Sequence, residues 1–179
     1  MKLLRTIRLD ASDTFVFEWA AEPGEWAVPG TFAFASRDVA SLAGKQRVAF
    51  RSGFLGVQSL GWSTLVEVVE VSEAERAAAV ALLAQHLIGH FGAPDMATAT
   101  AAAHEEVAFA ASLSEHPHGT VIGLMRKQES GSIRESFRTL APGSRIKPQR
   151  AFTFMEAADE EETPVEEIDL LALAREKHR

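Results

Sequence analysis

The residues best suited to binding an anion lie in one basic stretch near the end of the chain. Residues 126–150 contain seven lysines and arginines against two glutamates, a local net charge of +5 in a chain whose formal net charge is −7. Ser130-Gly131 is a favourable two-residue turn, and pairing the flanking strands about it sets Lys127 opposite Arg134 and Arg126 opposite Glu135.

One face of this predicted hairpin presents Lys127, Arg134 and Arg138, and the other has Arg126 and Glu135 as a cross-strand ion pair. Like charges directly opposite one another destabilise a sheet, so the cationic face favours a neutralising partner. An anionic ligand held bidentately by arginine is one candidate, and the acidic segment 159–162 of the same chain is another. The third interpretation is a solvated face whose cations protect the sheet from edge pairing.

Three histidines are the candidates for a metal site. His86 and His90 are four residues apart on a predicted helix, so both imidazoles can lie on one face. His104 lies on the next predicted helix, but an antiparallel pair turning near residue 93 sets it one turn, about 6 Å, from the position opposite His86. We therefore expect no metal site and no cofactor: His90 suits the C-terminal end of its helix, and His86 suits a packed, hydrogen-bonded position.

The sequence lacks the common catalytic motifs. It has no cysteine, which excludes thiolate nucleophiles, thiolate zinc sites and disulfides. It has no Walker phosphate loop, no Gly-x-Gly-x-x-Gly and no Gly-x-Ser-x-Gly. No catalytic residue is therefore predicted.

Length and composition indicate one globular domain followed by a tail. The chain has 179 residues, 46% hydrophobic and 24% charged, which is enough to bury a core. No apolar run approaches the roughly 18 residues of a membrane span, and the N-terminus lacks the apolar stretch of a signal peptide. We expect a cytoplasmic protein of bacterial type without a membrane partner, and its net acidity argues against a nucleic-acid partner.

The first seventy residues predict strands and turns. Phe15, Phe17 and Trp19 alternate as in a half-buried strand, and together with Phe32 and Phe34 they are more typical of a core than of a surface that stacks on a flat ligand. The other elements expected here are strands over 26–34 (with a bend or bulge at Pro29-Gly30), 47–51 and 62–71, and a short helix over 36–44.

The centre of the chain predicts two helices. Ser72 and Glu75 fit a capping box that starts a helix ending near residue 91. A second, alanine-rich helix over 95–113 follows, and small side chains allow the pair to approach closely as an αα-hairpin. Strands over 120–128 and 132–140 come next, then a last strand over 151–155. This order indicates an α+β domain over 1–155 with a mostly antiparallel sheet packed against a central αα-hairpin.

The C-terminal segment has the opposite charge to the hairpin. Residues 156–179 contain nine acidic residues against three basic ones, a net charge of −6. We expect an acidic linker over 156–163 and a C-terminal helix over 164–179, because Thr163 and Glu166 fit a second capping box. Leu170 and Leu173 lie on one stripe of this helix, which could bind a partner while another stripe docks on the domain. A helix that only closes its own core is the alternative.

Residues 62–140 resemble a known family, through Val68-Val69-Glu70-Val71-Ser72-Glu73-Ala74, Phe91-Gly92-Ala93-Pro94-Asp95 and Ser136-Phe137-Arg138-Thr139-Leu140. The family is a small bacterial one, known only as a domain of unknown function. The resemblance would cover most of the chain, and it implies no activity, cofactor or site residue.

Together these patterns favour a non-enzymatic accessory or assembly protein that engages a protein partner or a second copy of itself. The alternative is a small protein or enzyme that binds an anionic ligand through Lys127, Arg134 and Arg138. A histidine metal site at His86, His90 and His104 is the third hypothesis.

Overall fold

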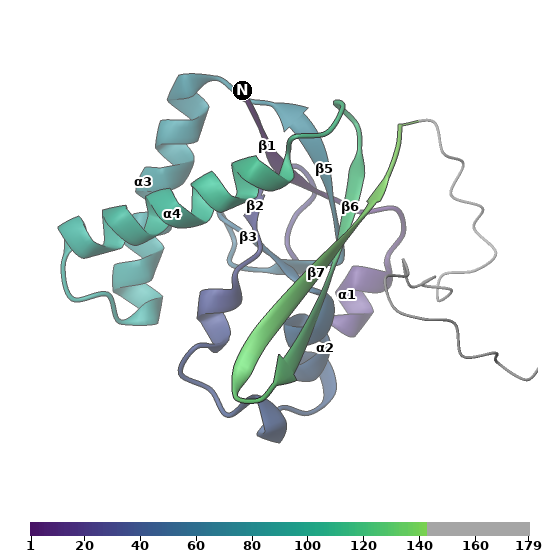
Figure 1. Ribbon diagram of the computed structural model, residues 1–179, viewed down its shortest axis with the longest axis vertical. Helices are drawn as coiled ribbons and strands as arrows, with labels where there is room; N and C mark the ends of the chain where they lie inside the picture. Colours follow the sequence, from purple (N-terminus) through teal and green to yellow (C-terminus); the bar gives the residue numbers. More distant parts are fainter. Residues whose placement is uncertain (143–179) are drawn as a thin grey trace, which may run out of the picture. The chain divides into compact units, whose positions relative to one another are not determined.

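The computed structural model describes residues 1–142, which form an α+β domain (Figure 1). Its named strands pair antiparallel in one sheet of order β4-β3-β2-β1-β5-β6-β7. The strands are β1 (Lys2–Ile7), β2 (Trp26–Val28), β3 (Phe54–Gly56), β4 (Trp62–Ser63), β5 (Leu65–Glu70), β6 (Val121–Glu129) and β7 (Ser132–Leu140). The helices are α1 (Ser12–Val16), α2 (Gly44–Ser52), α3 (Glu73–Phe91) and α4 (Met96–Leu113), with 3-10 turns η1 (Thr31–Phe34) and η2 (Val39–Ser41). The predicted fold class is confirmed, whereas the predicted strand 151–155, linker 156–163 and helix 164–179 lie outside the described residues.

The αα-hairpin is formed by α3 and α4, as predicted. Ser72 and Glu75 make the capping box in both directions, and Gly92 ends α3 in the left-handed conformation that glycine adopts without strain. Asp95 starts α4 by accepting a hydrogen bond from the Thr98 N–H. Buried alanines on both helices allow the close contact, and α4 also crosses β1 and β2 (Figure 1). No helix within residues 1–142 is long and apolar enough to cross a membrane.

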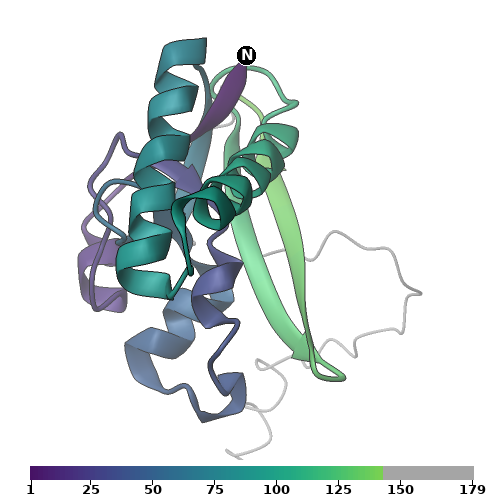
Figure 2. The same cartoon turned by 90° about the vertical axis from the view of Figure 1, so that its left-hand side faces the viewer.

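The β6–β7 hairpin also follows the prediction. Ser130 and Gly131 both have positive φ angles, of 50° and 79°, as a two-residue turn matched to the twist of the strands requires. The register pairs Lys127 with Arg134 and Arg126 with Glu135. Only the first three residues of β6 pair with β5, so the distal half of the hairpin extends past the other strands and packs against α2 (Figure 2).

The N-terminal third differs from the prediction in three places. The expected strand over 15–19 is wrong, because residues 12–16 form α1, which Asp13 anchors by accepting hydrogen bonds from the N–H and hydroxyl of Thr64. As a result Phe17 is buried, but Phe15 and Trp19 are exposed. The expected strand over 47–51 is also wrong: Gly44 begins helix α2 rather than ending a helix over 36–44, where only η2 forms.

Two further strands also differ from the prediction: one is shorter than expected, and β1 was not predicted. The expected strand over 26–34 stops at Val28, because Gly30 has a φ of 75° and leads into η1. A side chain at Gly30 would lie 2.5 Å from the Leu55 Cβ. β1 was not placed because it is covered on both faces: Leu3 and Leu4 are both buried, and the strand therefore lacks apolar–polar alternation.

The candidate site: a cleft built around a buried arginine

Arg126 is the largest fully buried side chain among the described residues, with 1% of its surface exposed. Its Nε donates to the Glu135 carboxylate at 2.8 Å and to the Thr31 hydroxyl at 3.0 Å. The Thr31 hydroxyl in turn donates to the same carboxylate. Burial lowers the pKa of the Arg126 guanidinium, and the Glu135 carboxylate opposes that shift. The predicted ion pair is therefore confirmed, but it is part of the protein interior.

The two terminal nitrogens of Arg126 bind backbone carbonyls from other elements. Nη1 donates to Phe50 at 3.0 Å and to Gly53 at 2.8 Å, at the C-terminal end of α2. Nη2 donates to the carbonyl of Pro29, just before η1. A guanidinium has donors in a fixed planar fork and can satisfy such separate acceptors at once. Arg126 thus ties η1 and α2 to β6.

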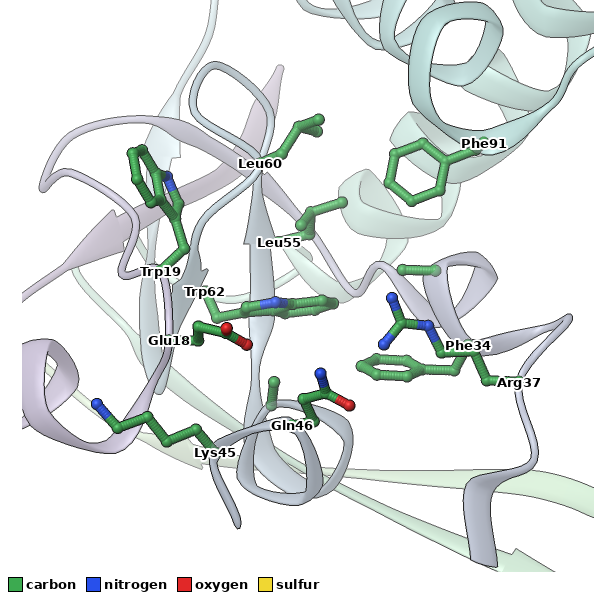
Figure 3. Close-up of a pocket in the computed structure, with 12 residues that line it drawn as sticks. Glu18, Trp19, Phe34, Arg37, Lys45, Gln46, Leu55, Leu60, Trp62 and Phe91 are labelled. Carbon is green, nitrogen blue, oxygen red and sulfur yellow. The ribbon is translucent and has the colours of Figure 1, made fainter. Parts of the chain in front are cut away.

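A cleft of about 260 Å³ is lined in part by η1 and α2, two of the elements that Arg126 joins (Figure 3). Inside it the Trp62 indole from β4 stacks on the Phe34 ring from η1, with ring centroids 5.2 Å apart and planes at 29°. Phe34 also meets Phe50 of α2 edge to face. Leu55, Leu60 and Phe91 complete the apolar lining. This arrangement suits an apolar or aromatic group.

Gly53 allows the Trp62 indole and the end of α2 to lie close together in the wall of the cleft. A Cβ at this position would lie 2.8 Å from the Trp62 ring and 2.8 Å from the Ala49 carbonyl oxygen. A larger residue would therefore displace either the indole or the end of α2.

The rim of the cleft is polar and has a positive excess. Arg37, Lys45, Gln46 and Glu18 line it, and the Trp19 indole stands at its mouth with 64% of the residue exposed (Figure 3). Neither rim cation is in a salt bridge within residues 1–142. The cleft therefore combines an aromatic interior with two accessible cations and one carboxylate.

The basic face predicted on the hairpin lies elsewhere. Lys127 and Arg134 are exposed and directly opposite one another, and the Arg134 Nε is 3.0 Å from the exposed Glu129 carboxylate. Arg138 is half-buried on the same face of β7. None of the three lines the cleft, so the anion site at these residues stays a separate prediction.

The histidines are only partly brought together. The rings of His86 and His90 lie 5.6 Å apart, while the exposed His104 lines a groove on the αα-hairpin with Val80 and Ala84. The buried Nε2 of His86 has no hydrogen-bond partner within the described part of the chain. No three potential metal ligands gather within residues 1–142.

An acidic residue faces the other side of the Arg126 network. Glu106 of α4 is half-buried, and its burial, followed by the repulsion of Glu135, raises its pKa to about 7. Arg126 acts in the opposite direction, and Glu105 adds a smaller upward shift. This carboxyl therefore titrates near neutral pH, and it is close enough to Arg126 and Glu135 for both charges to affect its pKa.

The sequence singled out two of the cleft residues, Trp19 and Phe34, but favoured a core position for them; one pattern could have drawn attention to the cations. Residues 37–51 contain four cations, Arg37, Lys45, Arg47 and Arg51, and only one acid, Asp38. This second basic stretch is less concentrated than the hairpin stretch. The stacking of Trp62 on Phe34 could not be predicted from neighbouring residues, because 28 positions separate the two in the chain.

The described residues form a small α+β domain with an open cleft lined by aromatic and basic side chains, and no metal cluster is assembled within residues 1–142. The sequence matches a family of unknown function, DUF6505, over residues 1–157, and the chain belongs to this family. The predicted resemblance to a family of unknown function over most of the chain is confirmed. No curated protein and no solved structure matches the chain. Leu170 and Leu173 lie beyond both the matched and the described residues.

Proposed function

We propose that this protein is a non-enzymatic accessory or assembly protein that acts by binding another protein through the surface around Trp19. One observation supports this most directly. Leu9, Phe15 and Trp19 are 58%, 72% and 64% exposed, and all three belong to the segment that joins β1 to β2. Large apolar side chains gathered in one exposed segment are typical of interaction surfaces, and tryptophan is enriched among the residues that dominate binding energy.

The proposal is tested by site-specific photo-crosslinking in native cells. A photoreactive phenylalanine analogue at Phe15 should give one stoichiometric adduct, and Trp19→Ser should remove it. The same analogue at Phe109, which is also exposed at 41% but lies on α4, is the matched control and should give no such adduct. An adduct with a second copy of the chain would identify a homo-oligomer. Absence of any adduct from position 15 would reject the proposal.

The small-anion alternative is favoured by the register of the hairpin. Lys127 and Arg134 are directly opposite, and Glu129 pairs with Arg134 alone, so an anion beside Lys127 would relieve the remaining repulsion. If this face binds a carboxylate or phosphate, such anions should raise the melting temperature, and the Arg134→Ala/Arg138→Ala variant should lose the effect. An intact protein that no anion stabilises would eliminate this alternative.

A further inference from the structure

We propose that the cleft binds a short acidic peptide segment through a single aromatic anchor side chain. This inference rests on the proposed function and specifies the chemistry of the partner. The anchor would pack on the Trp62 indole inside the cleft, and acidic residues beside it would meet Arg37 and Lys45 at the rim.

The size and openness of the cleft favour one side chain of a longer chain. Its volume of about 260 Å³ is below the roughly 300–1,000 Å³ of pockets that enclose small-molecule ligands. The exposed Trp19 at its mouth extends the apolar surface outward, so a chain that continues past the anchor gains further contact. A free metabolite would leave that surface uncovered.

The lining selects an aromatic anchor. The Trp62 and Phe34 rings are already stacked, and Phe91 and Leu60 line the same space (Figure 3). Aromatic groups gain from edge-to-face and offset contacts with such rings beyond the area that they bury. The pair is also held firmly, because Gly53 packs against the indole and Arg126 binds the backbone just before η1 and at the C-terminal end of α2.

The charge at the rim selects acidic flanking residues. Residues 37–51 have a net charge of +3, although the whole chain is −7. Arg37 and Lys45 reach the cleft from this segment, and neither is neutralised by a salt bridge within residues 1–142. Glu18 is the opposing charge at the rim, and Figure 3 shows its carboxylate between the Arg37 and Lys45 side chains, so acidic residues of a peptide are expected beside each cation on the side away from Glu18. Charge complementarity of this kind sets specificity and association rate more than affinity.

The test begins with selection of a random peptide library on the immobilised full-length protein. Enriched peptides should contain Phe, Tyr or Trp with Asp or Glu within two positions. They should bind the Arg37→Glu/Lys45→Glu variant at least about tenfold more weakly, since two exposed ion pairs are reversed. The Lys127→Glu/Arg134→Glu variant has the same change in net charge on a different surface, and it should bind within about twofold of the native protein.

Nuclear magnetic resonance then locates the binding. The chain has three tryptophans; Trp19 and Trp62 line the cleft, while Trp26 packs beneath Arg5, 4.2 Å from its guanidinium carbon, and does not line it. A synthetic peptide of the enriched sequence should shift the indole N–H resonances of Trp19 and Trp62 and leave that of Trp26 in place. A matched peptide with alanine for the aromatic residue should shift none.

Three results would overturn the inference: no enriched peptide, enriched peptides that are basic or lack an aromatic residue, or equal binding by the Arg37→Glu/Lys45→Glu variant. If no peptide is enriched and phenyl phosphate shifts the indole N–H resonances of Trp19 and Trp62, the cleft binds a small aromatic anion. That result would also overturn the peptide inference. The proposed function is judged separately by crosslinking from position 15. A native adduct that persists in the Arg37→Glu/Lys45→Glu variant would leave that function standing and reject only this assignment of the cleft.

Discussion

Replacing Arg126 with methionine should be among the most destabilising single changes in the described domain. The side chain is 1% exposed and is held by a carboxylate, a hydroxyl and the carbonyls of Pro29, Phe50 and Gly53. Methionine fills a similar apolar volume but donates no hydrogen bond. The variant therefore tests the polar contacts of Arg126 more than its packing.

The expected loss of stability follows from two contributions. Removing one partner of a buried ion pair costs about 3–5 kcal/mol, and the lower end applies here because the Glu135 side chain is 15% exposed. Each carbonyl that loses its donor adds roughly 1 kcal/mol before any rehydration. With three carbonyls, we expect a total of about 6 kcal/mol, comparable with the whole stability of a marginal domain.

Urea denaturation followed by tryptophan fluorescence and circular dichroism measures this loss. Arg134→Met is the matched control: its ion pair with Glu129 is 3.0 Å long, against 2.8 Å for Arg126 and Glu135, but both of its side chains are exposed. It should cost less than about 1 kcal/mol. An Arg126→Met variant that loses no more than this control would refute the reasoning.

A double variant separates the two contributions. Arg126→Met/Glu135→Leu replaces both charges with apolar groups, which commonly restores the share that belongs to a buried ion pair. The carbonyls of Pro29, Phe50 and Gly53 would still lack a donor. We therefore expect recovery of about half of the loss; full recovery would mean that the carbonyl bonds contribute nothing to stability.

Two further predictions concern the same region. The pKa of Glu106 is about 7 in the folded protein against 4.5 in the unfolded chain. Protonation of this carboxyl therefore stabilises the fold fully below pH 4.5, and the stabilisation is lost as the pH rises through 7. The free energy of unfolding should fall by up to about 3 kcal/mol between pH 5 and 8, and urea titrations at each pH should show a flatter dependence for Glu106→Gln. Gly53→Ala should cost about 1–3 kcal/mol and shift the Trp62 emission, because the added methyl meets the indole. Gly89→Ala, in α3 where nothing lies within 4 Å, should instead stabilise by up to about 1 kcal/mol; a Gly53→Ala variant as stable as Gly89→Ala would contradict the tight packing of the cleft wall.

The parts of the fold that could be predicted are those fixed by local chemistry. The αα-hairpin follows from the Ser72 capping box and from Gly92, each of which acts within a few residues. The β6–β7 register follows from Ser130-Gly131, because a two-residue turn fixes every pair along both strands. These signals need no knowledge of the rest of the molecule.

The N-terminal third could not be predicted in the same way. Three alternating aromatic residues fit a strand, but Asp13 bonds to Thr64, 51 positions away, and stabilises a helical turn instead. The cleft has the same character, since its rings and cations come from η1, α2, β4 and the end of α3. Only the tertiary fold brings these residues together.

Strand alternation explains why charge alone was an incomplete guide to the site. Neighbouring residues on β6 face opposite sides of the sheet, so Lys127 meets solvent while Arg126 enters the core. The basic hairpin therefore contributes to the cleft from its buried face, by holding η1 and α2 in place. The accessible cations beside the aromatic rings come from a different and less basic stretch. If the protein binds an acidic partner at the cleft, substitution of Arg126 would weaken binding through structure, whereas substitution of Lys45 would weaken it through charge and leave stability unchanged.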